Sequence, residues 1–210
     1  MNPGSFFADH SAEIFSATLE HLTLVLIAMT IAIAIGVPLG MFITQRPTLR
    51  TIALGIASIF QTIPSLALFG FLIPMPFIGG IGKRTAVAAL VLYALLPILR
   101  NTFVGLTSID PAVLEAAEAM GMTPAQILLR VRFPLALSFI LAGIRTATVI
   151  TIGVATIAAA IGAGGLGTFI FRGVALVNDS LILAGAIPAA LLALMADFLL
   201  ARLERRLRVL

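Results

Sequence analysis

The sequence predicts an all-α membrane protein with about five spanning helices. Of its 210 residues, 60% are hydrophobic and only 10% are charged, whereas soluble domains carry about 25% charged residues. The mean hydropathy is +1.17, and the few charges leave long stretches that are free of them. Soluble enzymes are therefore excluded. The chain also has no cysteine, which excludes disulfides, thiol catalysis and cysteine-ligated metals.

The gaps between charged residues define the spans, because one crossing needs roughly 20 apolar residues. No charge occurs in residues 22–45 or 51–82, and Arg100, Arg145 and Asp197 are isolated charges in three later stretches. The five predicted spans are residues 22–44, 53–75, 85–106, 135–159 and 181–202.

An odd number of spans places the two termini on opposite sides of the membrane. Cytoplasmic loops carry an excess of Lys and Arg, and this rule places the C-terminus inside. The membrane domain is then residues 22–203, residues 1–21 are an external segment with an amphipathic helix over 6–20, and 204–210 are a basic cytoplasmic tail. A partly disordered leader is the alternative for the first segment. The basic residues lie inside at Arg46, Arg50, Arg100, Arg130, Arg132, Arg202, Arg205, Arg206 and Arg208, and outside at Lys83, Arg84 and Arg172.

Helix-breaking residues occur inside the predicted spans, at Gly36, Pro38, Pro64 and Pro97. In lipid every freed backbone group needs a partner, so such residues lie against neighbouring helices or a cavity. This is typical of transporters. Other small residues in the spans are expected to allow close helix packing rather than to contact a substrate. They are Gly55, Ser58, Ser65, Gly70 and Gly153.

The loop between the third and fourth spans has its own helix signals. Asp110 followed by Pro111 predicts a helix start, and Gly121 predicts its end in a left-handed conformation. Thr123 and Gln126 have the spacing of a capping box, which predicts a second short helix that ends at two arginines. Two short helices on the basic side of the membrane indicate a docking element.

This loop resembles the EAA loop of ABC-importer permeases. Glu-Ala-Ala at residues 115–117 is followed by three residues, Gly121, nine residues and Val-Arg-Phe-Pro at 131–134. Val and Phe stand where the family has Ile and Leu. The resemblance implies that the loop at 108–134 is a coupling helix that docks on a cytoplasmic ATPase; a surface helix without a partner is the alternative. The residues carried over are Glu115, Ala116, Ala117, Gly121 and Pro134.

Two further segments are similar to the osmoprotectant branch of these permeases. They are residues 60–68 (FQTIPSLAL) and 92–102 (LYALLPILRNT), whereas residues 161–167 (IGAGGLG) are shared with methionine importer permeases. The resemblance implies a type I ABC importer permease in the bacterial inner membrane, carrying glycine betaine, choline or carnitine. A methionine or other small-solute importer is one alternative, and a secondary transporter or channel without an ATPase is another.

The resemblance also implies the partners. Two permease subunits, as a homodimer or close heterodimer, work with two cytoplasmic ATPases and an extracytoplasmic binding protein. ATP and Mg²⁺ belong to the ATPase, and no cofactor or metal is expected in this chain. The sequence contains no G-x-x-x-x-G-K-[ST] motif, so we expect it not to be an enzyme.

The glycine-rich segment literally satisfies G-x-G-x-x-G, but it follows a membrane helix rather than a strand, so a dinucleotide site is not expected. We expect an external gate or a dock for the binding protein there. Its glycines are Gly162, Gly164, Gly165 and Gly167.

Polar residues in the spans are the remaining candidates. Isolated charges are costly in a bilayer, so Arg145 and Asp197 are predicted to pair between the fourth and fifth helices. Quaternary amines favour aromatic cages, but the chain has no Trp and a single Tyr, which predicts a low-affinity path. His10 and His21 are expected at the surface. The residues expected to line the path are Gln61, Ser65, Tyr93 and Asn101.

Overall fold

The computed structural model describes residues 10–207, and in that range every regular element is a helix. Residues 1–9 of the predicted N-terminal segment and residues 208–210 of the predicted tail lie outside the described residues. Within residues 10–207, four helical runs are long and apolar enough to cross a membrane, and a bent pair can supply a fifth crossing. The four runs are α2 (Ser11–Ile43), α5 (Lys83–Thr107), Pro124–Ile161, which contains α8 (Phe133–Ile157), and α10 (Asp179–Arg206).

The bent pair corrects the second predicted span. Residues 53–75 are not one straight helix, because α3 (Pro47–Thr62) and α4 (Ser65–Leu72) meet at an angle of 106°. Pro64 lacks a backbone N–H and disfavours the α conformation of the preceding residue. Ile63 is accordingly extended, with φ −68° and ψ 129°. By contrast, Pro38 and Pro97 lie inside α2 and α5 without ending them.

The start of α2 also differs from the prediction. The helix runs without interruption from Ser11 to Ile43, so the described part of the predicted N-terminal segment continues directly into the first span. The apolar stretch that begins at Leu22 therefore does not coincide with a helix boundary.

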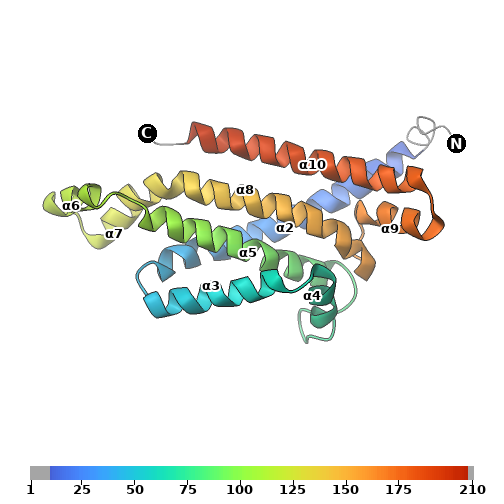
Figure 1. The fold of residues 1–210 in the computed structure, drawn as a ribbon, viewed down its shortest axis with the longest axis horizontal. Coiled ribbons are helices and arrows are strands. Elements are labelled where there is room, and N and C mark those ends of the chain that lie inside the picture. Colours follow the sequence, from blue (N-terminus) through green and yellow to red (C-terminus); the bar gives the residue numbers. More distant parts are fainter. Residues whose placement is uncertain (1–9, 208–210) are drawn as a thin grey trace.

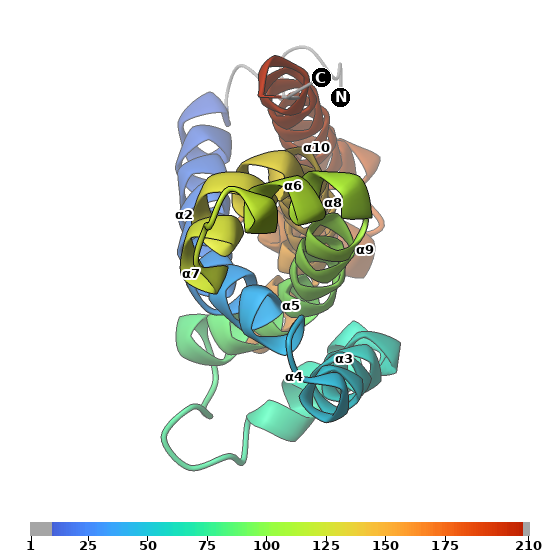
Figure 2. The same cartoon turned by 90° about the vertical axis from the view of Figure 1, so that its left-hand side faces the viewer.

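The helices form an elongated bundle in which α5 and α8 lie at the centre (Figure 1). Helix α2 crosses both of them, and α10 packs on α8 together with α9 (Gly167–Leu176). Helices α3 and α4 lie to one side, on the outer face of α5 (Figure 2). At one end of the bundle lies α6 (Pro111–Ala119); at the other end lie α9 and the start of α2 (Figure 1).

Glycines let the central helices approach closely. A Cβ on Gly36 of α2 would come within 2.7 Å of Ile98, and one on Gly143 of α8 would come within 2.6 Å of Asn101. Such contacts leave no room for a side chain, and small residues at helix interfaces are typical of membrane proteins. Two more glycines are enclosed in the same way, Gly40 and Gly105.

Four of the five small residues singled out in the sequence do not play this role. A Cβ added to Gly55, Gly70 or Gly153 would have no neighbouring atom within 4 Å, and Ser58 is exposed. The predicted packing role of these four residues is therefore wrong for contacts within this chain, whereas Ser65 is half-buried. The better signal is a four-residue spacing on α2, where every member is buried: Ala28, Ala32, Gly36 and Gly40.

Candidate functional site

The loop between α5 and α8 begins with a well-capped helix. The side chain of Asp110 accepts a hydrogen bond from the N–H of Ala112 at 2.9 Å, and Pro111 is the first residue of α6. Gly121 follows the helix with φ +75°, a conformation that favours glycine. Both features confirm the helix start and helix end predicted from the sequence.

The outer face of α6 carries two exposed carboxylates, Glu115 and Glu118, among apolar side chains. Glu115 and Ala116 are exposed, whereas Ala117 is 2% exposed and turns inward. Met120 and Leu129 are large apolar side chains that also lie exposed at this end of the molecule. A protruding face of this kind is suited to contact with another protein.

The second half of the loop differs from its prediction in one respect. Thr123 and Gln126 form the expected capping box at the start of α7 (Pro124–Gln126). The helix does not end at the arginines, however, but continues through the π-helical turn η1 (Ile127–Arg132) into α8.

Pro134 explains the π-helical turn. It cannot donate an α-helical hydrogen bond to the carbonyl four residues earlier, and the N–H of Phe133 bonds instead to the carbonyl of Leu128, five residues back. Short π-helical segments of this type are frequent at functional sites. The loop is thus joined to a membrane span by continuous helix, so a displacement of α7 must act on α8.

Three of the four predicted path residues gather at the break between α3 and α4. The Gln61 side chain donates to the carbonyl of Tyr93 at 3.5 Å, and the Tyr93 hydroxyl donates to the carbonyl of Ile63. Ser65 is the first residue of α4. Tyr93 is only 6% exposed, so its hydroxyl supports the break and does not face a cavity.

Asn101 lies apart from this group. It is eight residues after Tyr93 on α5, roughly 12 Å along the helix at about 1.5 Å per residue. Its amide donates to the carbonyl of Pro97 at 2.8 Å, and its Cβ fills the space opposite Gly143. These contacts are those of a packing residue.

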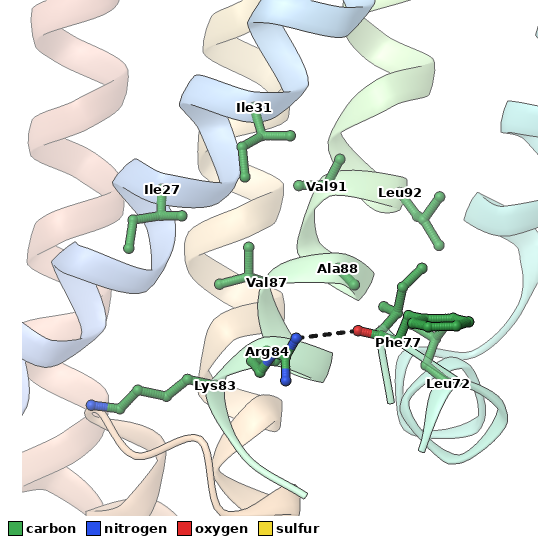
Figure 3. A pocket seen from close by; sticks show the side chains of 11 residues that line it. Ile27, Ile31, Leu72, Phe77, Lys83, Arg84, Val87, Ala88, Val91 and Leu92 are labelled. Atoms are coloured by element: carbon green, nitrogen blue, oxygen red, sulfur yellow. Dashed lines mark hydrogen bonds between the residues drawn. The ribbon is translucent and has the colours of Figure 1, made fainter. Parts of the chain in front are cut away.

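An apolar cavity of about 580 Å³ lies between α2, α5 and the segment that follows α4 (Figure 3). Its wall includes Ile27, Ile31 and Val91, and its charged members are Lys83 and Arg84. Two cations and one phenyl ring do not make a cage for a quaternary amine. None of the predicted path residues lines this cavity.

The glycine-rich segment forms a tight loop, which we call the glycine loop (residues 162–167). Gly162, Gly164 and Gly165 have φ values of +74°, +83° and +77°. The loop connects the short helix η2 (Ala158–Ile161) to α9. Gly167 is enclosed by the backbone of Thr156, so the loop is fixed by its neighbours.

Two residues that were not predicted from the sequence hold this loop. Glu20 accepts a hydrogen bond from the N–H of Gly165 at 2.8 Å and pairs with the Lys83 ammonium at 2.5 Å. His21 is 0% exposed, and its Nε2 lies 3.2 Å from the carbonyl of Ile152. The expectation that His21 lies at the surface is therefore wrong. The sequence contained one signal for these positions. Glu20 and His21 come directly before the uncharged residues 22–45, so they lie where the first span begins.

The structure brings Arg145 and Asp197 together in a bidentate pair. Nε and one terminal nitrogen of Arg145 donate to the two carboxylate oxygens at 2.6 and 3.0 Å. A third member, Glu204, lies 3.5 Å from the same guanidinium. Its position seven residues after Asp197 puts both carboxylates on one face of α10, a signal the sequence contained.

The sequence matches the family described as "Binding-protein-dependent transport system inner membrane component" over residues 36–209. It is 45% identical over 203 residues to the carnitine transport permease protein OpuCB of Listeria monocytogenes, covering 97% of this chain and 92% of that protein. It is 47% identical over 201 residues to the osmoprotectant import permease protein OsmW of Salmonella typhimurium, covering 95% and 94%.

Solved structures show the same fold. The MetNI methionine ABC transporter in an inward-facing conformation has a chain that matches with a TM-score of 0.81 and 26% identity, over 92% of this chain and 95% of that one. A chain of an amino acid ABC transporter matches with a TM-score of 0.77 at 22% identity, over 95% and 96%.

The candidate spans and the similarity to these solved transporters show a multi-pass membrane permease with the type I ABC importer fold. The chain belongs to the family of binding-protein-dependent transport system inner membrane components. In such a system the permease is the non-catalytic membrane component.

Proposed function

We propose that this chain forms the transport path of an ATP-driven importer for osmoprotectants such as glycine betaine, choline or carnitine. The observation that carries the proposal is the identity of 45–47%, over nearly the whole chain, to permeases named for carnitine and osmoprotectant transport. A choline transport system permease of Bacillus subtilis is 43% identical over 202 residues. Two of these relatives are named for carnitine and choline, which are both small quaternary amines, and the third is named for osmoprotectants.

The end of the molecule that carries α6 faces the cytoplasm in this proposal. The last turn of α10, with Arg205 and Arg206, lies at that end together with the arginines of η1. Lys83 and Arg172 belong to the opposite end, beside the start of α2 and in α9. This segregation agrees with the positive-inside rule and supports our proposal that the described start of α2 lies on the external side.

Coupling runs from α6 to the spans. A cytoplasmic ATPase that binds the exposed face around Glu115 and Ala116 pushes on α6 as it closes on ATP, which it holds with Mg²⁺. Gly121 and the capped start of α7 pass the displacement to η1 and Pro134, and so to α8. The path then opens outward to receive the cargo from the binding protein, and hydrolysis resets it.

Selection belongs to the external binding protein rather than to this chain. The cavity between α2 and α5 has an apolar wall and carries Lys83 and Arg84. These cations repel a quaternary amine, and no aromatic cage is formed by the residues that line it. The side chains of Gln61 and Tyr93 satisfy backbone carbonyls at the α3–α4 break. Ser65, the first residue of α4, lies beside them.

Methionine is the second candidate cargo. A chain of the MetNI methionine transporter matches with a TM-score of 0.81. That match favours an importer of the same architecture. The lower identity of 26% to that chain is why the quaternary amines rank first.

Co-purification tests whether this chain works with a cytoplasmic ATPase. The tagged chain, expressed with its partner ATPase, is expected to retain that subunit in detergent, and Gly121→Asp is expected to lose it. Arg84→Gln, at the other end of the molecule, is the matched control and is expected to retain it. A chain that never binds an ATPase contradicts the proposal and favours a transporter that works without one.

A further inference from the structure

Glu20 joins three segments that are far apart in the sequence. Its carboxylate pairs with Lys83, the first residue of α5, at 2.5 Å. The other carboxylate oxygen accepts the N–H of Gly165, in the glycine loop that follows α8, at 2.8 Å. One side chain of α2 therefore ties the start of α5 to the glycine loop, which η2 joins to the end of α8.

The glycine loop is shaped around this carboxylate. A Cβ on Gly164 would collide with the Glu20 carboxylate, and one on Gly165 would lie 3.2 Å from His21. Both glycines have positive φ, which turns the N–H of Gly165 toward Glu20. The backbone of the glycine loop thus leaves space for the Glu20 carboxylate and provides an N–H that donates to it.

His21 fixes the same end of α2 to α8. Its ring is fully buried, Nε2 lies 3.2 Å from the carbonyl of Ile152, and Nδ1 has no hydrogen-bond partner among the described residues. Glu20 differs from this buried anchor because its side chain is 34% exposed and that of Lys83 is 61% exposed. The Glu20 contacts are therefore the ones that can open to water.

The two helices tied by Glu20 are the two that lead to the coupling loop. The far end of α5 continues into α6, and α8 begins at η1. A displacement of the loop acts on both helices, and Glu20 holds their opposite ends together. This inference rests on the proposed function.

We propose that Glu20 is a latch that keeps the external end of the permease closed until the ATPase moves the coupling loop. It acts as a positioning residue: it holds the glycine loop and the start of α5 and does not touch the cargo. Opening outward breaks the contact with Lys83 or with Gly165. The latch thereby sets how strongly ATP hydrolysis depends on the loaded binding protein.

The chain offers a matched control next to Lys83. Arg84 extends in the opposite direction and donates to the carbonyl of Phe77 at 3.3 Å (Figure 3). It is also a cation at the start of α5, but it has no part in the latch. Arg84→Gln therefore removes the same charge at the same helix end and leaves Glu20 paired.

The test uses the complete importer in proteoliposomes, with ATP hydrolysis measured without and with the loaded binding protein. Glu20→Ala is expected to raise the unstimulated rate by about tenfold, the change that loss of one hydrogen bond to a charged group produces in an equilibrium. Lys83→Gln keeps the contact of Glu20 with Gly165. Its unstimulated rate of ATP hydrolysis is therefore expected to lie between the rates of Glu20→Ala and of the unaltered protein. Arg84→Gln is expected to match the unaltered protein. A role in folding alone would lower both rates together.

A reversible cross-link provides a second readout. Because the chain has no cysteine, Glu20→Cys with Lys83→Cys creates a unique pair for a short bis-methanethiosulfonate. The linked protein is expected to lose uptake and stimulated hydrolysis, and a reductant is expected to return it to the high unstimulated rate of Glu20→Ala.

An unchanged ratio of stimulated to unstimulated rates in both Glu20→Ala and Lys83→Gln overturns the latch. So does full uptake by the linked protein. If the unaltered complex itself shows no stimulation by the binding protein, the proposed function fails and the latch fails with it. The two failures are therefore distinguishable.

Discussion

Gln61 and Tyr93 each satisfy a backbone carbonyl at a point where a proline interrupts hydrogen bonding. Pro97 cannot donate to the carbonyl of Tyr93, and the Gln61 amide donates to it instead at 3.5 Å. In return the Tyr93 hydroxyl donates to the carbonyl of Ile63, beside the break at Pro64. Freed backbone groups in a membrane must find such partners, so the two residues hold α3 against α5.

Removing the Tyr93 hydroxyl tests this arrangement. Tyr93→Phe leaves the Ile63 carbonyl without that donor and is expected to lower the free energy of unfolding by about 1–3 kcal/mol. Thermal unfolding in detergent should show a midpoint lower by several degrees. Phe71→Leu, at an exposed position of α4, is the control and should change the midpoint little. An unchanged midpoint in Tyr93→Phe would contradict the role given to the hydroxyl.

Two glycines of α8 should respond in opposite ways to alanine. A Cβ on Gly143 would lie 2.6 Å from the Cβ of Asn101 and 2.8 Å from the carbonyl of Pro97. Gly143→Ala is therefore expected to cost about 1–3 kcal/mol of stability. Gly153→Ala has open space around it and should be neutral or stabilising by about 1 kcal/mol. Equal midpoints for the two variants would argue against close packing of α5 on α8.

The pair of Arg145 and Asp197 predicts a particular order of stabilities. Asp197→Leu leaves Arg145 with only its longer contact to Glu204, and Arg145→Met leaves the Asp197 carboxylate without its cation in a predicted span. Replacing both removes that cost, because a well-packed apolar pair can substitute for an ion pair. The double variant is therefore expected to unfold at a higher temperature than either single variant. A double variant less stable than both singles would show that the pair is not the main partner of either charge, and would point to Glu204.

Gly121 is expected to matter through its backbone alone. It has φ +75° and no atom within 4 Å of a Cβ position, so Gly121→Ala meets no clash but strains the left-handed turn by about 1–2 kcal/mol. We expect weaker retention of the ATPase with little change in the unfolding midpoint of the membrane helices. Gly55→Ala, in open space within α3, should leave ATPase retention unchanged. Full retention in Gly121→Ala would show that the turn can adopt another shape.

Local signals in the sequence predicted the coupling loop well, because capping depends on residues close together in the chain. The start of α6 at Asp110, the turn at Gly121 and the capping box at Thr123 are all decided within a few residues. The charge gaps predicted the four long helical runs, and the fifth predicted span is the bent pair of α3 and α4. The pairing of Arg145 with Asp197 could also be inferred, since isolated charges in a bilayer have few alternatives.

Long-range contacts explain what the sequence did not predict. Gly55 and Gly143 are both small residues in apolar helices, and nothing local shows that only Gly143 faces another helix. His21 is buried because α8 and the glycine loop cover it, residues more than a hundred positions away. The bend at Pro64 was marked as a break, but its angle of 106° depends on the packing of α4 against α5.

The most direct test of the proposed function is uptake of labelled glycine betaine by cells that lack their own osmoprotectant systems and express this chain with its ATPase and binding protein. We predict energy-dependent uptake that unlabelled choline or carnitine reduces, that methionine does not, and that Glu115→Lys abolishes. Glu115 is exposed, so this substitution should leave the fold intact. A complex that hydrolyses ATP but takes up no glycine betaine, or whose uptake methionine blocks, would contradict the proposed cargo.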